Sequence, residues 1–125
     1  MTLAVIVSLI ILALLSLFQL LLIAGVPLGH FAWGGQHNVL PRKLRIGSVF
    51  SIFIYALIAI CILSKASVLQ IIPAGSFLDI ICWIIFAYLA LGIFMNAISR
   101  SKKERYTMTP VAAVLAICLY MVASS

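Results

Sequence analysis

Four apolar runs, separated by short polar segments, constrain the fold of this chain more than any other feature. They cover about residues 3–23, 46–63, 77–98 and 110–123. At 1.5 Å per helical residue the first three reach roughly 27–33 Å, enough to cross a hydrocarbon core of about 30 Å. The fourth reaches only about 21 Å, so it requires local thinning of the bilayer or polar ends that sit low in the interface.

These runs predict membrane-spanning α-helices. The hydrocarbon core offers no water to an unpaired backbone, and a barrel strand would alternate apolar and polar residues. With 66% hydrophobic and 8% charged residues, the chain also has too few charges to cover a water-soluble domain. We therefore predict an all-α polytopic membrane protein, with four transmembrane helices in a compact bundle that forms a single domain over residues 1–125. The first run lacks a basic leader and is longer than a signal-peptide core, so we expect it to be retained.

Local signals predict where the helices begin and end. Thr109 followed by Pro110 is typical of an N-cap and first helical residue, and predicts the start of the fourth helix. Ser76 with Asp79 three residues later predicts a capping box at the start of the third helix. Lys65 is expected to end the second helix and to extend toward the interface.

The positive charges predict the orientation of the helices. Of the eight Lys and Arg residues, only Lys65 falls in the second connection. The positive-inside rule then places the first and third connections in the cytoplasm and both termini outside, in a bacterial inner membrane. The seven basic residues of those two connections are Arg42, Lys43, Arg45, Arg100, Lys102, Lys103 and Arg105.

These seven residues are also a candidate anion site. Basic clusters beside membrane helices attract anionic lipid headgroups by about 1 kcal/mol per charge, so we predict a bilayer with anionic lipids as a partner. The alternative is a ligand that carries a phosphate or carboxylate. Because the charges flank membrane spans, nucleic acid is not a predicted partner.

Each predicted helix carries one polar or small-residue stripe. At about 100° per residue, these stripes predict either the seams between packed helices or the lining of a cavity that opens to the cytoplasm. No Asp, Glu, Lys, Arg or His lies in the middle of a span, which argues against a proton-driven antiporter. The candidate ligand-binding residues on these stripes are Gln19, Tyr55, Tyr88 and Asn96.

The connection from Pro27 to Arg45 is the most unusual irregular segment. It combines two histidines, a tryptophan and the Gly34-Gly35 pair. One interpretation is a re-entrant or interfacial segment that presents a ligand site at the mouth of the bundle, and the simpler one is an interfacial turn. Imidazole needs further ligands to hold a metal, and none stands near, so neither a metal nor a cofactor is predicted. The candidate ligand-binding residues of this segment are His30, Trp33, Gln36 and His37.

The three cysteines, Cys61, Cys82 and Cys118, all lie inside apolar runs. They form no C-x-x-C pair and have no metal-type spacing with histidine. We interpret them as small apolar packing residues.

Two motifs carry a resemblance to a known group of proteins. "GHFAWGGQHNVLP" (29–41) follows the first span, and "SRSKKERYTMTPVAAVLA" (99–116) leads into the fourth. With them the chain resembles a family of uncharacterised small four-helix bacterial integral membrane proteins. The resemblance implies a compact membrane bundle and implies no activity. The chain lacks the first-helix glutamate of small multidrug transporters, the cysteine pair of quinone-linked thiol oxidoreductases and the polar track of fluoride channels.

Three hypotheses of function remain open at this point. The leading one is a non-enzymatic protein that binds or transports a small or lipid-like ligand at a cytoplasm-facing mouth. The second is a membrane enzyme that acts on a lipid or isoprenoid substrate, with His30 or His37 as general base. The third is an accessory subunit of a larger membrane complex. Because four thin helices enclose little volume, a homo-oligomer or a heteromeric membrane partner is expected.

Overall fold

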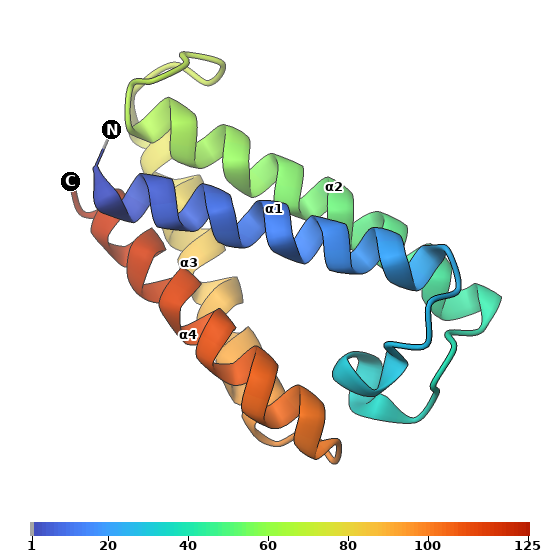
Figure 1. The fold of residues 1–125 in the computed structure, drawn as a ribbon. Helices are drawn as coiled ribbons and strands as arrows, with labels where there is room; N and C mark the ends of the chain where they lie inside the picture. Colours follow the sequence, from blue (N-terminus) through green and yellow to red (C-terminus); the bar gives the residue numbers. More distant parts are fainter. Residues whose placement is uncertain (1) are drawn as a thin grey trace.

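The computed structural model describes residues 2–125, and four long helices account for most of them (Figure 1). Each helix is long and apolar enough to cross a membrane, and the helices pack together, so the predicted all-α fold is confirmed. Two short 3-10 turns lie between the first two helices. The elements are α1 (Leu3–Ile23), η1 (Gly29–Phe31), η2 (Trp33–Gly35), α2 (Arg42–Lys65), α3 (Ser76–Ala97) and α4 (Lys102–Ala123).

The two helices that follow basic segments begin earlier than predicted. α2 begins at Arg42, directly after Pro41, and α4 begins at Lys102. Hydropathy marks only the part of a helix that lies in hydrocarbon, whereas both helices continue into the polar interface. Their first turns therefore carry positive charge, which the helix dipole disfavours.

The predicted start of the fourth helix is wrong. Ser101, not Thr109, is the N-cap of α4, and its Oγ accepts a hydrogen bond of 3.3 Å from the backbone N–H of Glu104. Pro110 lies inside the helix instead of at its first position. There its missing N–H leaves one carbonyl of the preceding turn without a helical donor.

The predicted capping box at the start of α3 is also wrong. Gly75 is the N-cap and makes no side-chain bond, while Ser76 is already helical. Asp79 instead accepts a hydrogen bond from Lys65 Nζ at 2.6 Å, which joins the end of α2 to the start of α3. Because the Asp79 carboxylate is half exposed, this ion pair contributes less than about 1 kcal/mol to stability.

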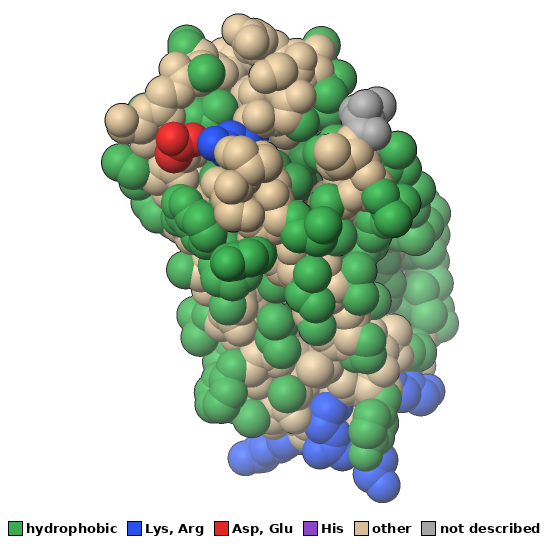
Figure 2. Space-filling view, turned by 90° about the vertical axis from the view of Figure 1, so that its left-hand side faces the viewer, with side chains coloured by type: hydrophobic (Ala, Val, Ile, Leu, Met, Phe, Trp, Pro, Cys, Tyr) green, Lys and Arg blue, Asp and Glu red, His purple; other side chains and the backbone are tan. Residues whose placement is uncertain are grey.

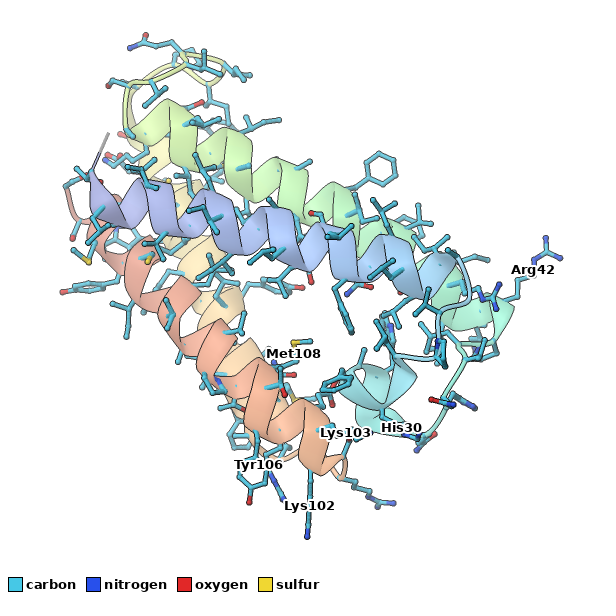
Figure 3. The ribbon with its side chains drawn as sticks, viewed as in Figure 1. His30, Arg42, Lys102, Lys103, Tyr106 and Met108 are labelled. Carbon is cyan, nitrogen blue, oxygen red and sulfur yellow. The ribbon has the colours of Figure 1, made fainter. Side chains whose placement is uncertain are left out.

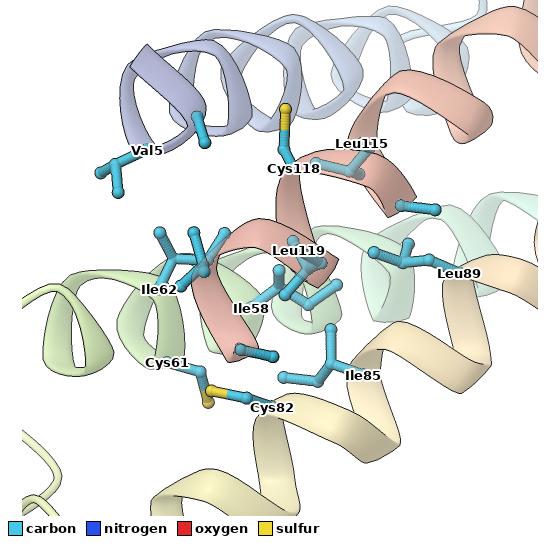
Figure 4. Packing of buried hydrophobic residues seen from close by; sticks show 14 of the residues in the cluster. Val5, Ile58, Cys61, Ile62, Cys82, Ile85, Leu89, Leu115, Cys118 and Leu119 are labelled. Atoms are coloured by element: carbon cyan, nitrogen blue, oxygen red, sulfur yellow. The ribbon is translucent and has the colours of Figure 1, made fainter. Parts of the chain in front are cut away.

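The main core lies toward the end of the bundle where α1 begins and α4 ends. Side chains from all four helices meet there (Figure 4), and Cys61, Ile62, Cys82 and Leu119 have no exposed surface. The three cysteines are buried and free, and Figure 4 shows the sulfurs of Cys61 and Cys82 pointing toward one another. The large apolar side chains on the outside of the helices are exposed, as expected where lipid is the solvent.

Away from this core the helices separate into two hairpins. Figure 1 shows α1 and α2 diverging from α3 and α4 toward the end where α2 and α4 begin. The irregular residues 27–41 fold back into the space between the hairpins and are called the 27–41 segment below. The two hairpins therefore lie farther apart at this end than at the main core.

Candidate functional site

A cavity of about 200 Å³ lies between the two hairpins and against the 27–41 segment. All four helices and both 3-10 turns contribute to its walls. Its floor is apolar and includes Leu89 and Leu115 of the main core. Aromatic rings and polar groups make up much of the remaining wall: Phe18, Phe31, Trp33, Tyr55, Tyr88, Gln19, Asn96 and Glu104.

Backbone bonds and a small apolar cluster fold the 27–41 segment. The N–H of Gly29 donates to the carbonyl of Asn38 at 2.8 Å, so the two ends of the segment run side by side. Gly29 must be glycine here, because a Cβ would collide with the carbonyl oxygen of His37. Ala32 and Leu40 pack onto Leu22 of α1, and all three are buried. The segment is thus anchored to the α1–α2 hairpin.

Trp33 has a strained backbone that places its indole ring against α2. Its φ is +52°, a conformation that bulky residues rarely adopt and that costs about 1–3 kcal/mol. The indole Nε1–H donates to Ser48 Oγ at 3.4 Å. A Cβ on Gly47 would approach the ring to 2.9 Å, so that glycine provides the space for it. Strain of this kind is common at functional sites.

The same segment also contacts α4. Ser101 Oγ donates a hydrogen bond to the carbonyl of His30, seventy-one positions away. Gly35, with φ +70°, lies so close to Ser101 that a Cβ would collide with the serine side chain. Lys103 Nζ lies 5.7 Å from the centre of the Phe31 ring, and Figure 3 shows Lys103 pointing toward the segment while Lys102 points away. The segment therefore bridges the two hairpins.

Glu104 is a cavity residue that the sequence reasoning missed. It lies in the first turn of α4, is 8% exposed, and lines the cavity. Its Oε1 accepts a hydrogen bond from Ser99 Oγ at 2.5 Å, and Ser99 Oγ in turn accepts from the N–H of Ser101 at 3.2 Å. The Ser101-x-x-Glu104 spacing is itself a capping-box signature, which would have indicated the start of the helix.

Five of the predicted ligand-binding residues line this one cavity. Gln19, Tyr55, Tyr88 and Asn96 come from three helices, and Trp33 comes from the 27–41 segment. Gln19 is 7% exposed, and its Oε1 has no hydrogen-bond partner among the described residues. Asn96 Nδ2 donates to the carbonyl of Gly92, one turn earlier, at 2.8 Å.

The other three predicted residues lie outside the cavity wall. Gln36 and His37 are exposed. His30 Nδ1 lies 3.1 Å from the carbonyl of Gly35, to which it donates, so this side chain stabilises the local turn. Within residues 2–125, no group of three His, Cys, Asp or Glu side chains is arranged to hold a metal ion.

The seven basic residues gather at the end of the molecule where the cavity lies, as Figure 2 shows for Lys and Arg side chains. They do not form one uniform surface. Arg45 Nε donates to the carbonyl of Leu40 at 2.8 Å, and this contact ties the first turn of α2 to the 27–41 segment. Arg105 stacks on Tyr106, with 5.1 Å between the guanidinium carbon and the ring centre. Lys102 and Arg42 point outward in Figure 3.

A second hollow, of about 660 Å³, adjoins the cavity beside α3. Both hollows include Trp33, Tyr88, Gly92, Asn96 and Glu104 in their walls. The outer edge of the second hollow is formed by exposed apolar side chains of α3 and the turn after it: Leu91, Met95 and Ile98. In a membrane-spanning helix such side chains face lipid, so the second hollow lies on the side that faces the bilayer.

The four spans and their packing define the class: the chain is a small integral membrane protein with four transmembrane helices. Comparison with family models, with curated proteins and with solved structures found no match to it.

Proposed function

We propose that this protein binds a small or lipid-like ligand in the cavity between its two hairpins, with the 27–41 segment as the cover. One observation carries the proposal: side chains from all four helices and from the 27–41 segment enclose one cavity, in which Gln19, Asn96 and Glu104 stand among apolar and aromatic walls. Pockets with apolar walls and a few converging polar groups are typical of small-molecule sites.

The proposal includes the membrane and the orientation predicted from the charges. The protein would reside in a bacterial inner membrane, with the cavity end toward the cytoplasm and both termini outside. The basic side chains at that end would contact anionic lipid headgroups. Binding alone, transport of the ligand, and assembly with a second copy or another membrane protein are all compatible with this arrangement.

The enzyme hypothesis gains no support from the positions of the histidines. His30 is engaged with Gly35, and His37 is exposed and does not line the cavity. A general base must be within hydrogen-bond reach of its substrate. The accessory-subunit hypothesis has no specific contact in its favour.

Filling the cavity should abolish binding without unfolding the protein. Gly92 lines both hollows, and a Cβ placed on it meets no atom within 4 Å, so Gly92→Leu puts a side chain into open space. We expect mass spectrometry of the detergent-extracted protein to detect a co-purified ligand with the wild type and none with this variant. Ala90→Leu is the matched control, because Ala90 is exposed on α3 and lines neither hollow.

Two results would contradict the proposal. One is equal ligand content in Gly92→Leu and wild type, which would place the ligand elsewhere. The other is extraction of only bulk lipid from wild type, Ala90→Leu and Gly92→Leu alike.

The orientation has its own expected result. A reporter that is active only in the cytoplasm should give no signal when fused after Ser125, and should give a signal when inserted between Ile98 and Ser101. These positions lie at opposite ends of α4. The opposite pattern would invert the proposed topology, although it would leave the cavity unchanged.

A further inference from the structure

We infer that the ligand is an amphipathic organic cation. Its positive group would lie beside Glu104 and the aromatic rings of the cavity, and its apolar part would extend through the second hollow toward lipid. This inference rests on the proposed function and names the chemical class of its ligand.

The first support is the state of Glu104. Its side chain is buried, and the structure gives its carboxylate one hydrogen bond, from Ser99 Oγ. Within residues 2–125, no Lys, Arg or His nitrogen lies within 4.0 Å of that carboxylate. The neighbouring Lys103 and Arg105 lie instead over aromatic rings. Buried charges in proteins are paired or bound to a ligand, so a cation is the partner that this site lacks.

The second support is the composition of the wall. Five aromatic side chains line the cavity with Glu104, and the faces of aromatic rings attract cations within about 6 Å, most strongly when water is excluded. An anionic ligand would meet like charge at Glu104. The aromatic residues are Phe18, Phe31, Trp33, Tyr55 and Tyr88.

The third support is the position of the second hollow, beside the cavity and next to lipid-facing side chains of α3. The basic residues at this end repel a cation that approaches through water, over a range of about 8–10 Å at physiological salt. The second hollow offers a different route, because Leu91 and Met95 at its edge face the lipid. A ligand with an apolar body partitions into the bilayer first and then reaches Glu104 from the side. This route explains why the ligand is both cationic and amphipathic.

Three matched probes test the inference. Phenyltrimethylammonium, its neutral carbon isostere tert-butylbenzene, and the anion benzenesulfonate have similar size and differ in charge. Binding is measured from Trp33 emission in phosphatidylcholine nanodiscs, in a Trp83→Phe background that leaves Trp33 as the one tryptophan. Trp83 contacts the rings of Phe86 and Tyr120 and lines neither hollow.

We expect saturable binding of phenyltrimethylammonium, at least ten-fold tighter than that of tert-butylbenzene, and no binding of benzenesulfonate. Glu104→Gln should weaken phenyltrimethylammonium binding at least ten-fold, because it removes the charge and keeps an oxygen that accepts from Ser99. Asp79→Asn is the matched control: it removes the other acidic charge, at the opposite end of the bundle, and should change nothing.

The probe comparison in the unaltered site keeps the test decisive if Glu104→Gln fails to fold. Equal affinity for the cation and its neutral isostere, preference for the anion, or absence of phenyltrimethylammonium binding would each overturn the inference. So would a folded Glu104→Gln variant with unchanged affinity. Each of these results would rule out a cationic ligand and leave the proposed binding site in place. Mass spectrometry could still detect a neutral ligand in the wild type that is lost in Gly92→Leu. The failure of the inference and the failure of the proposed function are therefore distinguishable.

Discussion

Gly35→Ala should release the 27–41 segment from α4 and destabilise the protein by about 2–5 kcal/mol. An alanine at φ +70° costs about 1–2 kcal/mol, and the collision of its Cβ with Ser101 adds a further cost of about 1–3 kcal/mol. The hydrogen bond from Ser101 Oγ to the carbonyl of His30 depends on the same close approach. Thermal unfolding followed by circular dichroism would measure the loss, and in a Trp83→Phe background the emission of Trp33 should shift to the red.

The neighbouring glycine supplies the control. Gly34 has φ +76°, but a Cβ placed on it meets no atom within 4 Å. Gly34→Ala should therefore cost only the backbone term of about 1–2 kcal/mol and leave the emission of Trp33 unchanged. If the two variants lose equal stability, then the contact between Gly35 and Ser101 does not hold the segment, and its position between the hairpins would need another explanation.

Leu119→Ala should destabilise the bundle by about 2 kcal/mol. Leu119 has no exposed surface and lies in the core that joins the four helices. In a water-soluble protein such a change costs about 2.7–5 kcal/mol, from lost transfer energy and from the cavity left behind. Lipid is as apolar as this core, so only the packing loss remains here. Titration with a denaturing detergent, followed by circular dichroism, would measure the change.

Leu14→Ala is the matched control for this effect. Leu14 is 60% exposed on α1, so its side chain contacts lipid. When the side chain is shortened, lipid fills the space that it leaves. We expect a change below about 0.5 kcal/mol. A Leu119→Ala variant as stable as Leu14→Ala would show that the helices are not held by the core described above. A large loss in Leu14→Ala would instead reveal a packed partner on that face of α1.

The spans were predictable because hydropathy is a local property of the chain. α1 was predicted over 3–23 and extends from Leu3 to Ile23. The predictions failed at Lys102 and Arg42, where charged residues continue a helix beyond the hydrocarbon. Charge marks the limit of the apolar solvent and not the limit of the helix, and a capping signature such as Ser101-x-x-Glu104 is needed to locate the start.

The cavity could be predicted in part. Helical phase alone grouped Gln19, Tyr55, Tyr88 and Asn96 on inward faces, and these residues do line one cavity. Glu104 was not among the predicted site residues, because its burial depends on the packing of Ser99 and the 27–41 segment around it. His30 and His37 attracted attention by residue type, but neither lines the cavity, since type alone says nothing of the direction in which a loop side chain points.

The sequence by itself determined the number of spans, their approximate extent and the gathering of seven basic residues at one end. Each of these follows from residues close together in the chain and from the thickness of the bilayer. Only the tertiary structure decided that the hairpins diverge, that the 27–41 segment folds between them, and that Glu104 and Gln19 line one cavity. Those features depend on contacts between distant residues, such as Ser101 with His30, and no local pattern encodes the distance between two such residues.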